Sequence, residues 1–547
     1  NNVGVGAALT PLGESLVRDA RPVLLIVQGV VLAVLAIACV NLANLLLVRT
    51  HARRQELAVR RAMGAGRGRL VRQLLAESLV LGLAGGVAGV LVGLWGIEGL
   101  RAIGGEGSAM QALALDGRVL AVAAGLSVVS GLLAGLLPAL AAGRTADPLA
   151  GGARTAGGTG GRRLRQGLVT LQLAMALVLL VGAGLMLRSL DRVLAVDLGF
   201  DAGEAVTAEI ALPEASYDRP RTIDFFTRLE ERLAARPEIA RVALVDPLPL
   251  SGSSNSSSIE IEGQPPPSDG RAHQARYATV DSGYFAAMGI ERLAGRAFTR
   301  ADGPEAPPVT IVDRRFAERH WPGETAVGRR VRWGGEWAQV VGVVEPVPYV
   351  RPDEEPQPVY YRPLAQSTSR RMDVVVRGGD PELAAAALAE ELAALDPEIP
   401  VHRLRSLPEV ALGSIERHRY PAILLGLFAA VALLLAALGT YGVMAYSVVH
   451  RTREIGVRMA LGAGRRQVLA TVMGEGMGLV AAGVVVGLAG GWVLGRVLSG
   501  LLYQVSPADP ASFVAVTAVL AATAALACWL PARRAAATDP LTALRWE

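Results

Sequence analysis

The sequence predicts a polytopic α-helical membrane protein with about seven transmembrane helices and a large extracytoplasmic α/β domain. Two observations predict this fold class. Hydrophobic residues make up 52% of the 547 residues, and many lie in segments that are apolar on every side, whereas helices of soluble proteins usually carry one apolar stripe. Each of these segments is about as long as the roughly 20 residues that a helix needs to cross a hydrocarbon core.

The predicted spans cover residues 23–48, 74–100, 119–142, 168–187, 422–449, 468–494 and 512–530. Charged residues such as Glu77 and Glu475 lie toward the ends of these spans and not near their middle. Carriers that are coupled to protons or ions use acidic residues within the membrane. The span composition therefore argues against that class of transporter.

The segments between spans alternate between Arg-rich and Arg-poor ones, and those after the first, third and fifth spans are rich. Cytoplasmic loops carry an excess of basic residues. We therefore expect a multi-pass membrane protein, with residues 189–420 extracytoplasmic and the C-terminus cytoplasmic. Residues 188–421 carry 36 acidic residues against 28 Arg, so the net charge of +5 comes from the membrane loops. This distribution argues against nucleic acid as a partner.

An internal duplication becomes visible when the sequence is compared with itself at an offset of 398 residues. Glu56, Arg60, Ala62, Gly64 and Gly66 return as Glu454, Arg458, Ala460, Gly462 and Gly464. The glycines of the second span return in the sixth, and Asp147-Pro148-Leu149 matches Asp539-Pro540-Leu541. Two copies of a three-span unit therefore bracket the fourth span and the long polar segment.

These boundaries divide the chain into six segments. Residues 1–21 are expected to be the remnant of a first external domain whose own leading span is absent. The others are a first three-span unit at 22–148, a basic linker at 149–166, a further span at 167–188, the external domain at 189–420 and a second three-span unit at 421–547.

The external segment is expected to be an α/β subdomain with a β-richer insert at about residues 255–370. Strands are predicted at 205–212, 242–245, 373–377 and 399–403, with helices at 219–235 and 381–395. Within the insert, strands are predicted at 309–312 and 339–344. The Ser-rich run 251–258 is expected to be a mobile loop or a contact loop.

The segments after the first and fifth spans carry the most specific pattern. In each, a Glu precedes an Arg by four residues, which is the favourable orientation for an ion pair on a helix. Each pattern ends in Gly-Ala-Gly, a helix stop. A simple tether in the headgroup region would need charge but no fixed order of residues. We therefore expect each segment to be a short cytoplasmic helix that docks a partner.

The second and sixth spans carry glycine at every fourth position, which allows helices to approach closely in lipid. These helix-packing residues are Gly85, Gly89, Gly93, Gly483, Gly487 and Gly491. Packing is expected for them in preference to the lining of a pore.

Signals for catalysis are absent from the sequence. The chain has no Lys, so it cannot form a lysine-bearing phosphate loop. Its six His show no spacing of metal ligands, and Cys39 and Cys528 both fall within predicted spans. We expect no catalytic residue, no metal site, no cofactor and no disulfide framework.

Taken together, these residues resemble the permease domain of the MacB/FtsX-type (type VII) ABC transporters, in the duplicated-permease arrangement. The resemblance is carried by the repeated pattern Arg-x-x-Glu-(Leu/Ile)-x-Val-Arg-x-Ala-(Met/Leu)-Gly-Ala-Gly, followed by a Glu at the start of a glycine-striped span. It implies that both three-span units are FtsX-like and that residues 189–420 form a MacB-like periplasmic domain with a porter-like part.

The resemblance also implies a location, the bacterial inner membrane, and a function. The chain would be a non-catalytic permease that couples ATP hydrolysis by a separate ABC-type ATP-binding subunit, expected as a dimer, to motions of the periplasmic domain. Residues Glu56 to Gly66 and Glu454 to Gly464 would be the ATPase-coupling elements, and membrane lipid and periplasmic proteins would be further partners. The alternative is a membrane-anchored binding or signalling module that regulates an envelope partner without moving a solute.

Overall fold

A computed structural model describes residues 21–537, except 54–55, 57–58, 61–62, 64–65, 104–113, 145–158, 266–272 and 356. The predicted remnant at 1–20, most of the linker, the motif at 539–541 and the site residues Ala62 and Gly64 therefore lie outside the described residues. The described chain divides into two compact units. One contains residues up to 189 and from 421 onward, and the other contains residues 190–420.

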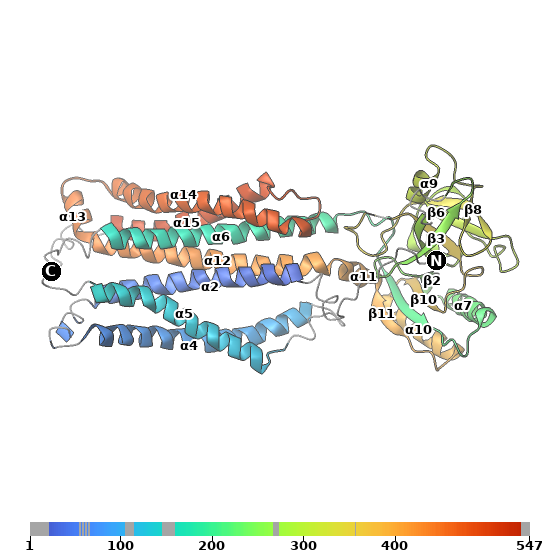
Figure 1. Cartoon of the computed structure of the whole chain (residues 1–547), viewed down its shortest axis with the longest axis horizontal. Helices are drawn as coiled ribbons and strands as arrows, with labels where there is room; N and C mark the ends of the chain where they lie inside the picture. Colours follow the sequence, from blue (N-terminus) through green and yellow to red (C-terminus); the bar gives the residue numbers. More distant parts are fainter. Residues whose placement is uncertain are drawn as a thin grey trace. The chain divides into compact units, whose positions relative to one another are not determined.

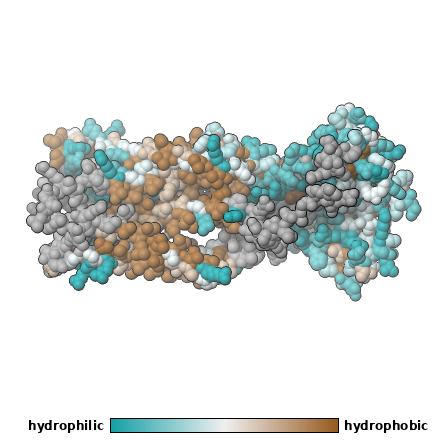
Figure 2. All heavy atoms as spheres, in the orientation of Figure 1, coloured by the Kyte–Doolittle hydropathy of each residue, from teal (hydrophilic) through white to brown (hydrophobic). Residues whose placement is uncertain are grey.

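Within the described residues, seven helices of the first unit are long and apolar enough to cross a membrane, which confirms the predicted fold class. Their apolar side chains cover the helical surface in Figure 2. The long helices are α2 (Arg21–Ala52), α4 (Arg67–Ile103), α5 (Gly117–Arg144), α6 (Thr159–Leu194), α12 (Glu416–His450), α14 (Arg465–Leu498) and α15 (Pro510–Ala536). The short α13 (Thr452–Ala460) joins α12 to α14 (Figure 1).

Hydrogen bonds between side chains and backbone connect the two repeats inside this unit. The carbonyl oxygen of Leu435 in α12 accepts from Asn41 Nδ2 of α2 at 2.8 Å and from Gln172 Nε2 of α6 at 2.6 Å. The repeat places Gly439 at the position of Asn41, and a Cβ at Gly439 would lie 2.6 Å from Gln172 Oε1. The missing side chain therefore makes room for both amides.

The strands of the second unit form one 11-stranded sheet, which begins with four antiparallel strands in the order β11-β1-β10-β2 and continues from β2 into the strands of the insert. The four-stranded part and its helices are β1 (Ala205–Ala211), α7 (Arg219–Ala234), β2 (Ile239–Asp246), β10 (Arg371–Gly378), α10 (Pro381–Leu395) and β11 (His402–Ser406). This β-α-β-β-α-β order is that of a split βαβ, or ferredoxin-like, unit. Leu229 and Phe226 of α7 and Leu388 of α10 pack with the strands in one core. A short helix, α11 (Leu407–Ser414), follows β11.

The segment between β2 and β10 forms the predicted β-rich insert. Its elements are β3 (Asn255–Ile261), β4 (His273–Val280), α8 (Tyr284–Met288), β5 (Arg292–Gly295), β6 (Val309–Asp313), α9 (Arg314–His320), β7 (Arg330–Arg332), β8 (Trp337–Val344) and β9 (Val359–Pro363). The strands β4-β3-β7-β8-β6-β9 are neighbours in that order, and β9 pairs again with β4. The insert is therefore a small closed barrel.

Two local predictions for this unit are wrong. The Ser-rich run is not a loop over its whole length, because residues 255–258 belong to β3, where Ser257 pairs with Ala275 and hydrogen-bonds Tyr360 Oη at 2.6 Å. The last strand begins at His402 and not at residue 399, since residues 397–399 form a turn and bend after α10. In both places tertiary pairing overrides the local composition.

Candidate functional site

The short element of the second repeat forms as the sequence predicts, as a helix that ends at a glycine. The backbone of Gly462 has φ +100°, in the left-handed region that favours glycine, and Ala463 N donates to Arg458 O at 2.9 Å. Gly464 is the N-cap of α14, and its N–H donates to Gln467 Oε1 at 3.1 Å. The first glycine of Gly-Ala-Gly therefore ends α13, and the second starts the next span.

The equivalent segment of the first repeat is described in part. Glu56, Val59 and Arg60 lie in helical backbone, and Met63 lies in a turn. Gly66 O accepts from Arg69 N at 3.0 Å, so Gly66 precedes α4 as Gly464 precedes α14.

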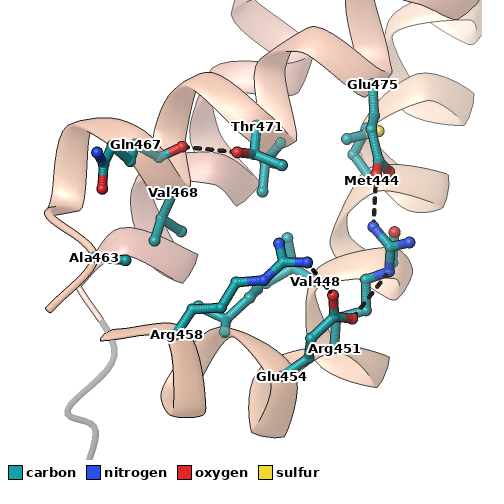
Figure 3. Close-up of a pocket in the computed structure, with 13 residues that line it drawn as sticks. Met444, Val448, Arg451, Glu454, Arg458, Ala463, Gln467, Val468, Thr471 and Glu475 are labelled. Carbon is teal, nitrogen blue, oxygen red and sulfur yellow. Dashed lines mark hydrogen bonds and ion pairs between the residues drawn. The ribbon is translucent and has the colours of Figure 1, made fainter. Parts of the chain in front are cut away.

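The two predicted Glu–Arg pairs are present with the same geometry. Arg60 Nη2 lies 2.6 Å from Glu56 Oε1. Arg458 Nη2 lies 2.7 Å from Glu454 Oε1, as Figure 3 shows. All four side chains are well exposed to solvent. Exposed pairs of this kind contribute only about 0.3–0.5 kcal/mol to folding, so their repetition calls for a reason other than stability.

A second ion pair, which the sequence analysis did not identify, ties each short element to the following span. Arg451 Nη1 lies 2.7 Å from Glu475 Oε1 in α14 (Figure 3), and Arg53 Nη1 lies 3.5 Å from Glu77 Oε1 in α4. The hydrogen bond to Glu475 raises the pKa of the Arg451 guanidinium. Arg53 and Arg451 stand at equivalent repeat positions, as do Glu77 and Glu475, which is the signal that could have revealed these pairs.

The two copies of this charge network differ at one position. In the first repeat, Arg60 Nη1 donates to Gln73 Oε1 at 3.0 Å, and Gln73 Nε2 donates to Glu77 Oε1 at 3.4 Å, so the polar contacts close into a ring. The second repeat has Thr471 at this position, and its hydroxyl donates to Gln467 O in its own helix. The network there stays open.

Each network borders a pocket. The pocket of the second repeat holds about 570 Å³ of empty space and is lined by residues of α12, α13 and α14, among them Met444, Val448 and Val468 (Figure 3). Its counterpart in the first repeat holds about 370 Å³ and lies between the end of α2 and the start of α4. The shorter Thr471 thus goes together with the wider pocket.

Each short element also exposes two large apolar side chains one helical turn apart. In the first repeat, Val59 is 57% exposed and Met63 is 76% exposed. Their equivalents are Val457, at 42%, and Leu461, at 83%. On α13, Ile455 faces the other way and packs into a cluster with Val468 and Ala535. Each element thus presents an apolar pair beside its Glu–Arg pair, a combination suited to contact with another protein.

The glycine stripes lie elsewhere in the first unit. Gly483, Gly487 and Gly491 of α14 are buried against α6. No other heavy atom of the described chain comes within 4 Å of a Cβ placed at Gly85, Gly89 or Gly93 of α4.

Within the described ranges, no group of three or more His, Cys, Asp and Glu side chains is arranged to hold a metal ion. Each network contains two Glu and two Arg, with Gln73 added in the first repeat and Thr471 in the second, and it lies beside exposed aliphatic side chains. These groups offer charged and apolar contacts side by side.

Comparison with known proteins gives matches over most of the chain. Residues 29–146 and 426–540 match the FtsX-like permease C-terminal family, and residues 174–395 match the MacB-like periplasmic core domain.

Two relatives are identical to this chain at about a quarter of the aligned positions. The pyoverdine export ATP-binding/permease protein PvdT of Pseudomonas putida is 28% identical over 267 residues, which cover 46% of this chain and 40% of that protein. The uncharacterized ABC transporter permease YvrN of Bacillus subtilis is 26% identical over 290 residues, which cover 49% of this chain and 69% of that protein. The chain therefore spans less than half of PvdT.

Among solved structures, the periplasmic region of MacB from Actinobacillus actinomycetemcomitans is similar to this chain, with 15% sequence identity and a TM-score of 0.28. The match covers 42% of this chain and 98% of that one.

Proposed function

This chain belongs to the family of ABC transporter permeases that join FtsX-like permease segments to a MacB-like periplasmic core domain, and from this premise we propose that it is a non-catalytic subunit driven by a separate ATPase. These 547 residues contain no Lys, so they cannot themselves form a Walker A loop, which needs a lysine to reach the phosphates. The ATP-binding subunit would be a dimer, with one protomer for each repeat.

The coupling surface of this proposal is the pair of short elements on the Arg-rich side of the spans. The observation that carries it is the repetition of one surface at two sites, with an exposed Glu–Arg pair and an exposed apolar pair on each. The Arg-rich loops favour a cytoplasmic location for both elements, on the side where the ATPase would be.

The ion pairs to the spans support force transmission through these elements. Arg451 contacts Glu454 at 3.8 Å and Glu475 at 2.7 Å, so it joins α13 to α14. A displacement of α13 by a partner would therefore be passed to a membrane-spanning helix. We propose that such displacements reach residues 190–420 and reshape that domain during export or another envelope process.

The proposal is tested by removing the apolar pairs. A variant with Val59→Ser, Met63→Ser, Val457→Ser and Leu461→Ser should still fold, because all four side chains are exposed. We expect at least a tenfold loss of co-purifying ATP-binding subunit and a matching loss of ATP turnover in reconstituted vesicles. A second variant removes both ion pairs through Glu56→Ala, Arg60→Ala, Glu454→Ala and Arg458→Ala. It should give the same result.

The control is Leu404→Ser, which alters a 45% exposed leucine of β11 in the other unit and should leave ATPase association unchanged. Unchanged association and turnover in both multiple variants would mean that the two elements only connect membrane spans.

A further inference from the structure

One end of the barrel in the insert holds an arginine among aromatic side chains. Arg362 follows Tyr360 on β9 by two residues, so both side chains point to the same face of the strand, and Tyr360 belongs to the barrel core. Tyr277 of β4 and Trp333, in the turn after β7, pack against the same core. Both rings are half-buried, as is Arg362. These side chains therefore lie where the core of the barrel reaches solvent.

Three rings surround the guanidinium of Arg362. Its Cζ lies 3.7 Å from the ring centre of Tyr277, 4.7 Å from that of Trp333 and 5.0 Å from that of Tyr360. We call these three rings the aromatic cage. Arg362 Nη2 also donates to Ser257 Oγ at 3.2 Å and to Tyr360 Oη. Side chains from β3, β4, β9 and one turn thus hold the cation in a fixed position.

The charge of Arg362 has no counter-ion among the described residues. No described carboxylate lies within ion-pair distance of its guanidinium, Nε is buried without a hydrogen-bond partner, and Nη1 donates to no described atom. The other half-buried arginines described in the insert all have a carboxylate partner. They are Arg276, Arg315, Arg332 and Arg351, which pair with Glu354, Glu355, Glu260 and Asp353.

An acid two strands away does not supply the missing charge. Asp246 of β2 is paired with Thr279 of β4, and Thr279 is paired with Arg362. Ser369 Oγ donates to Asp246 Oδ2 at 2.6 Å, so this carboxyl already has another partner. Burial also raises the pKa of Asp246, which favours its neutral form.

The charge is not needed to close the end of the barrel. Contact with ring faces favours a cation, but a partly desolvated charge without a counter-ion is costly. An apolar side chain of similar length would cover the same rings without that cost. The positive charge at this position is therefore explained best by an anion that binds there.

We propose that Arg362 and the aromatic cage bind a small organic carboxylate with an apolar or aromatic body. A planar guanidinium matches the geometry of a carboxylate, and the half-buried rings of Tyr277 and Trp333 offer apolar surface to the body. A single arginine, in a segment with 36 acidic residues against 28 Arg, suits one negative charge better than the two of a phosphate. The mouth of a β-barrel is a frequent place for such a ligand.

The test measures binding of 4-fluorophenylacetate to the full chain in detergent by fluorine NMR, with the same detergent alone as the blank. We expect saturable binding at millimolar concentrations. The amide 4-fluorophenylacetamide has the same ring without the charge and should bind at least tenfold more weakly. This comparison uses the wild type, so it does not depend on the folding of any variant.

Variants then locate the site. Arg362→Met should weaken binding of 4-fluorophenylacetate at least tenfold, because Met keeps an apolar stem against the rings but removes the charge. The matched control is Arg292→Met, which alters an exposed arginine of β5 that forms no ion pair with a described residue and should bind the probe like the wild type. Trp333→Leu should lower the affinity for the probe more than that for acetate, which has no ring.

Three outcomes would overturn the proposal. Equal binding of the acid and the amide by the wild type would mean that the charge is not recognised. Displacement of the probe by inorganic phosphate at lower concentrations than by acetate would assign the site to phosphate. Unchanged binding by Arg362→Met, with its fold confirmed by resistance to proteolysis, would place the probe elsewhere on the chain.

Discussion

At the scale of single residues, two buried acids of the second unit give it a dependence on pH. Burial raises the pKa of Asp313 to about 7, and it does the same for Asp281. One oxygen of Asp313 accepts from Phe316 N at 2.6 Å and caps α9, while the other is buried without a hydrogen-bond partner among the described residues. The protonated form of this carboxyl is therefore favoured in the folded protein.

The Asp313→Asn variant tests this argument. The ordinary pKa of an aspartate is 3.8, so between about pH 4 and pH 7 the folded unit holds a proton that the unfolded chain releases. The free energy of unfolding of the wild type should fall as pH rises through that interval, by about 1.4 kcal/mol for each unit of pKa difference. The variant should show a shallower slope, because Asp281 still contributes its own share, and it should keep the cap, because Asn is an equally good N-cap residue.

Pulse proteolysis of the full-length chain in urea at several pH values measures this slope. The matched comparison is Asp302→Asn. The pKa of Asp302 is lowered by its hydrogen bond to Arg296, at 2.7 Å, so its stabilising effect is present at neutral pH and is lost in acid. The argument fails if Asp313→Asn and the wild type show the same slope.

Single residues also mark the limit of what the sequence could predict about the site. The Glu56–Arg60 and Glu454–Arg458 pairs follow directly from their spacing on a helix. The exposure of Val457 and Leu461 does not, because it depends on which face of α13 packs on α14 and α15. The Arg451–Glu475 pair joins residues 24 positions apart, and only the fold brings them together.

At the scale of elements, the contrast between the glycine rows gives a matched pair of substitutions. Gly487→Ala should push α6 away, since its Cβ would lie 2.8 Å from Leu177 Cβ and 3.0 Å from Ala174 O. Overpacking of this kind costs about 1–3 kcal/mol. Gly89→Ala, at the equivalent position of α4, meets no atom within 4 Å and should leave the stability of the purified chain unchanged or slightly higher.

Thermal unfolding of both variants in the same detergent compares them. Equal loss of stability in the two would show that the glycines act through the helix backbone and not through the contact with α6.

The elements themselves were largely predictable from the sequence. Helix α10 begins at Pro381 and ends at Leu395 as expected, because Asp380 caps a regular pattern that opens with Pro. The seven apolar spans are all helices. The strand β3 was not recognised, because three serines in a row, Ser256 to Ser258, carry no apolar alternation. Its register is set by β4 and by the hydrogen bond of Ser257 to Tyr360.

At the scale of the whole molecule, the Arg-rich loops predict that residues 190–420 lie outside the cytoplasm and that the segment containing α13 lies inside it. In a chain with Cys39→Ala and Cys528→Ala, we expect Ser256→Cys to react with a membrane-impermeant maleimide on intact spheroplasts. Ala463→Cys should react only after permeabilisation. Ser256 is exposed on β3, and Ala463 is half-buried beside α14, so both are accessible to the reagent. Reversed labelling would contradict the predicted orientation.

The closed strand circuit of the insert has a consequence for how an exported domain avoids aggregation. A strand without a neighbour offers free N–H and C=O groups to other chains. Each strand from β4 round to β9 has a partner on both sides along at least part of its length. Among the described strands, β11 and β5 are edges of the sheet. Both are short: β5 has four residues and pairs only with β8, and β11 has Arg403 in a left-handed conformation beside an interrupted register. The unit therefore presents few edges on which a neighbouring molecule could template a continuous sheet, and it does so without a disulfide among its described residues.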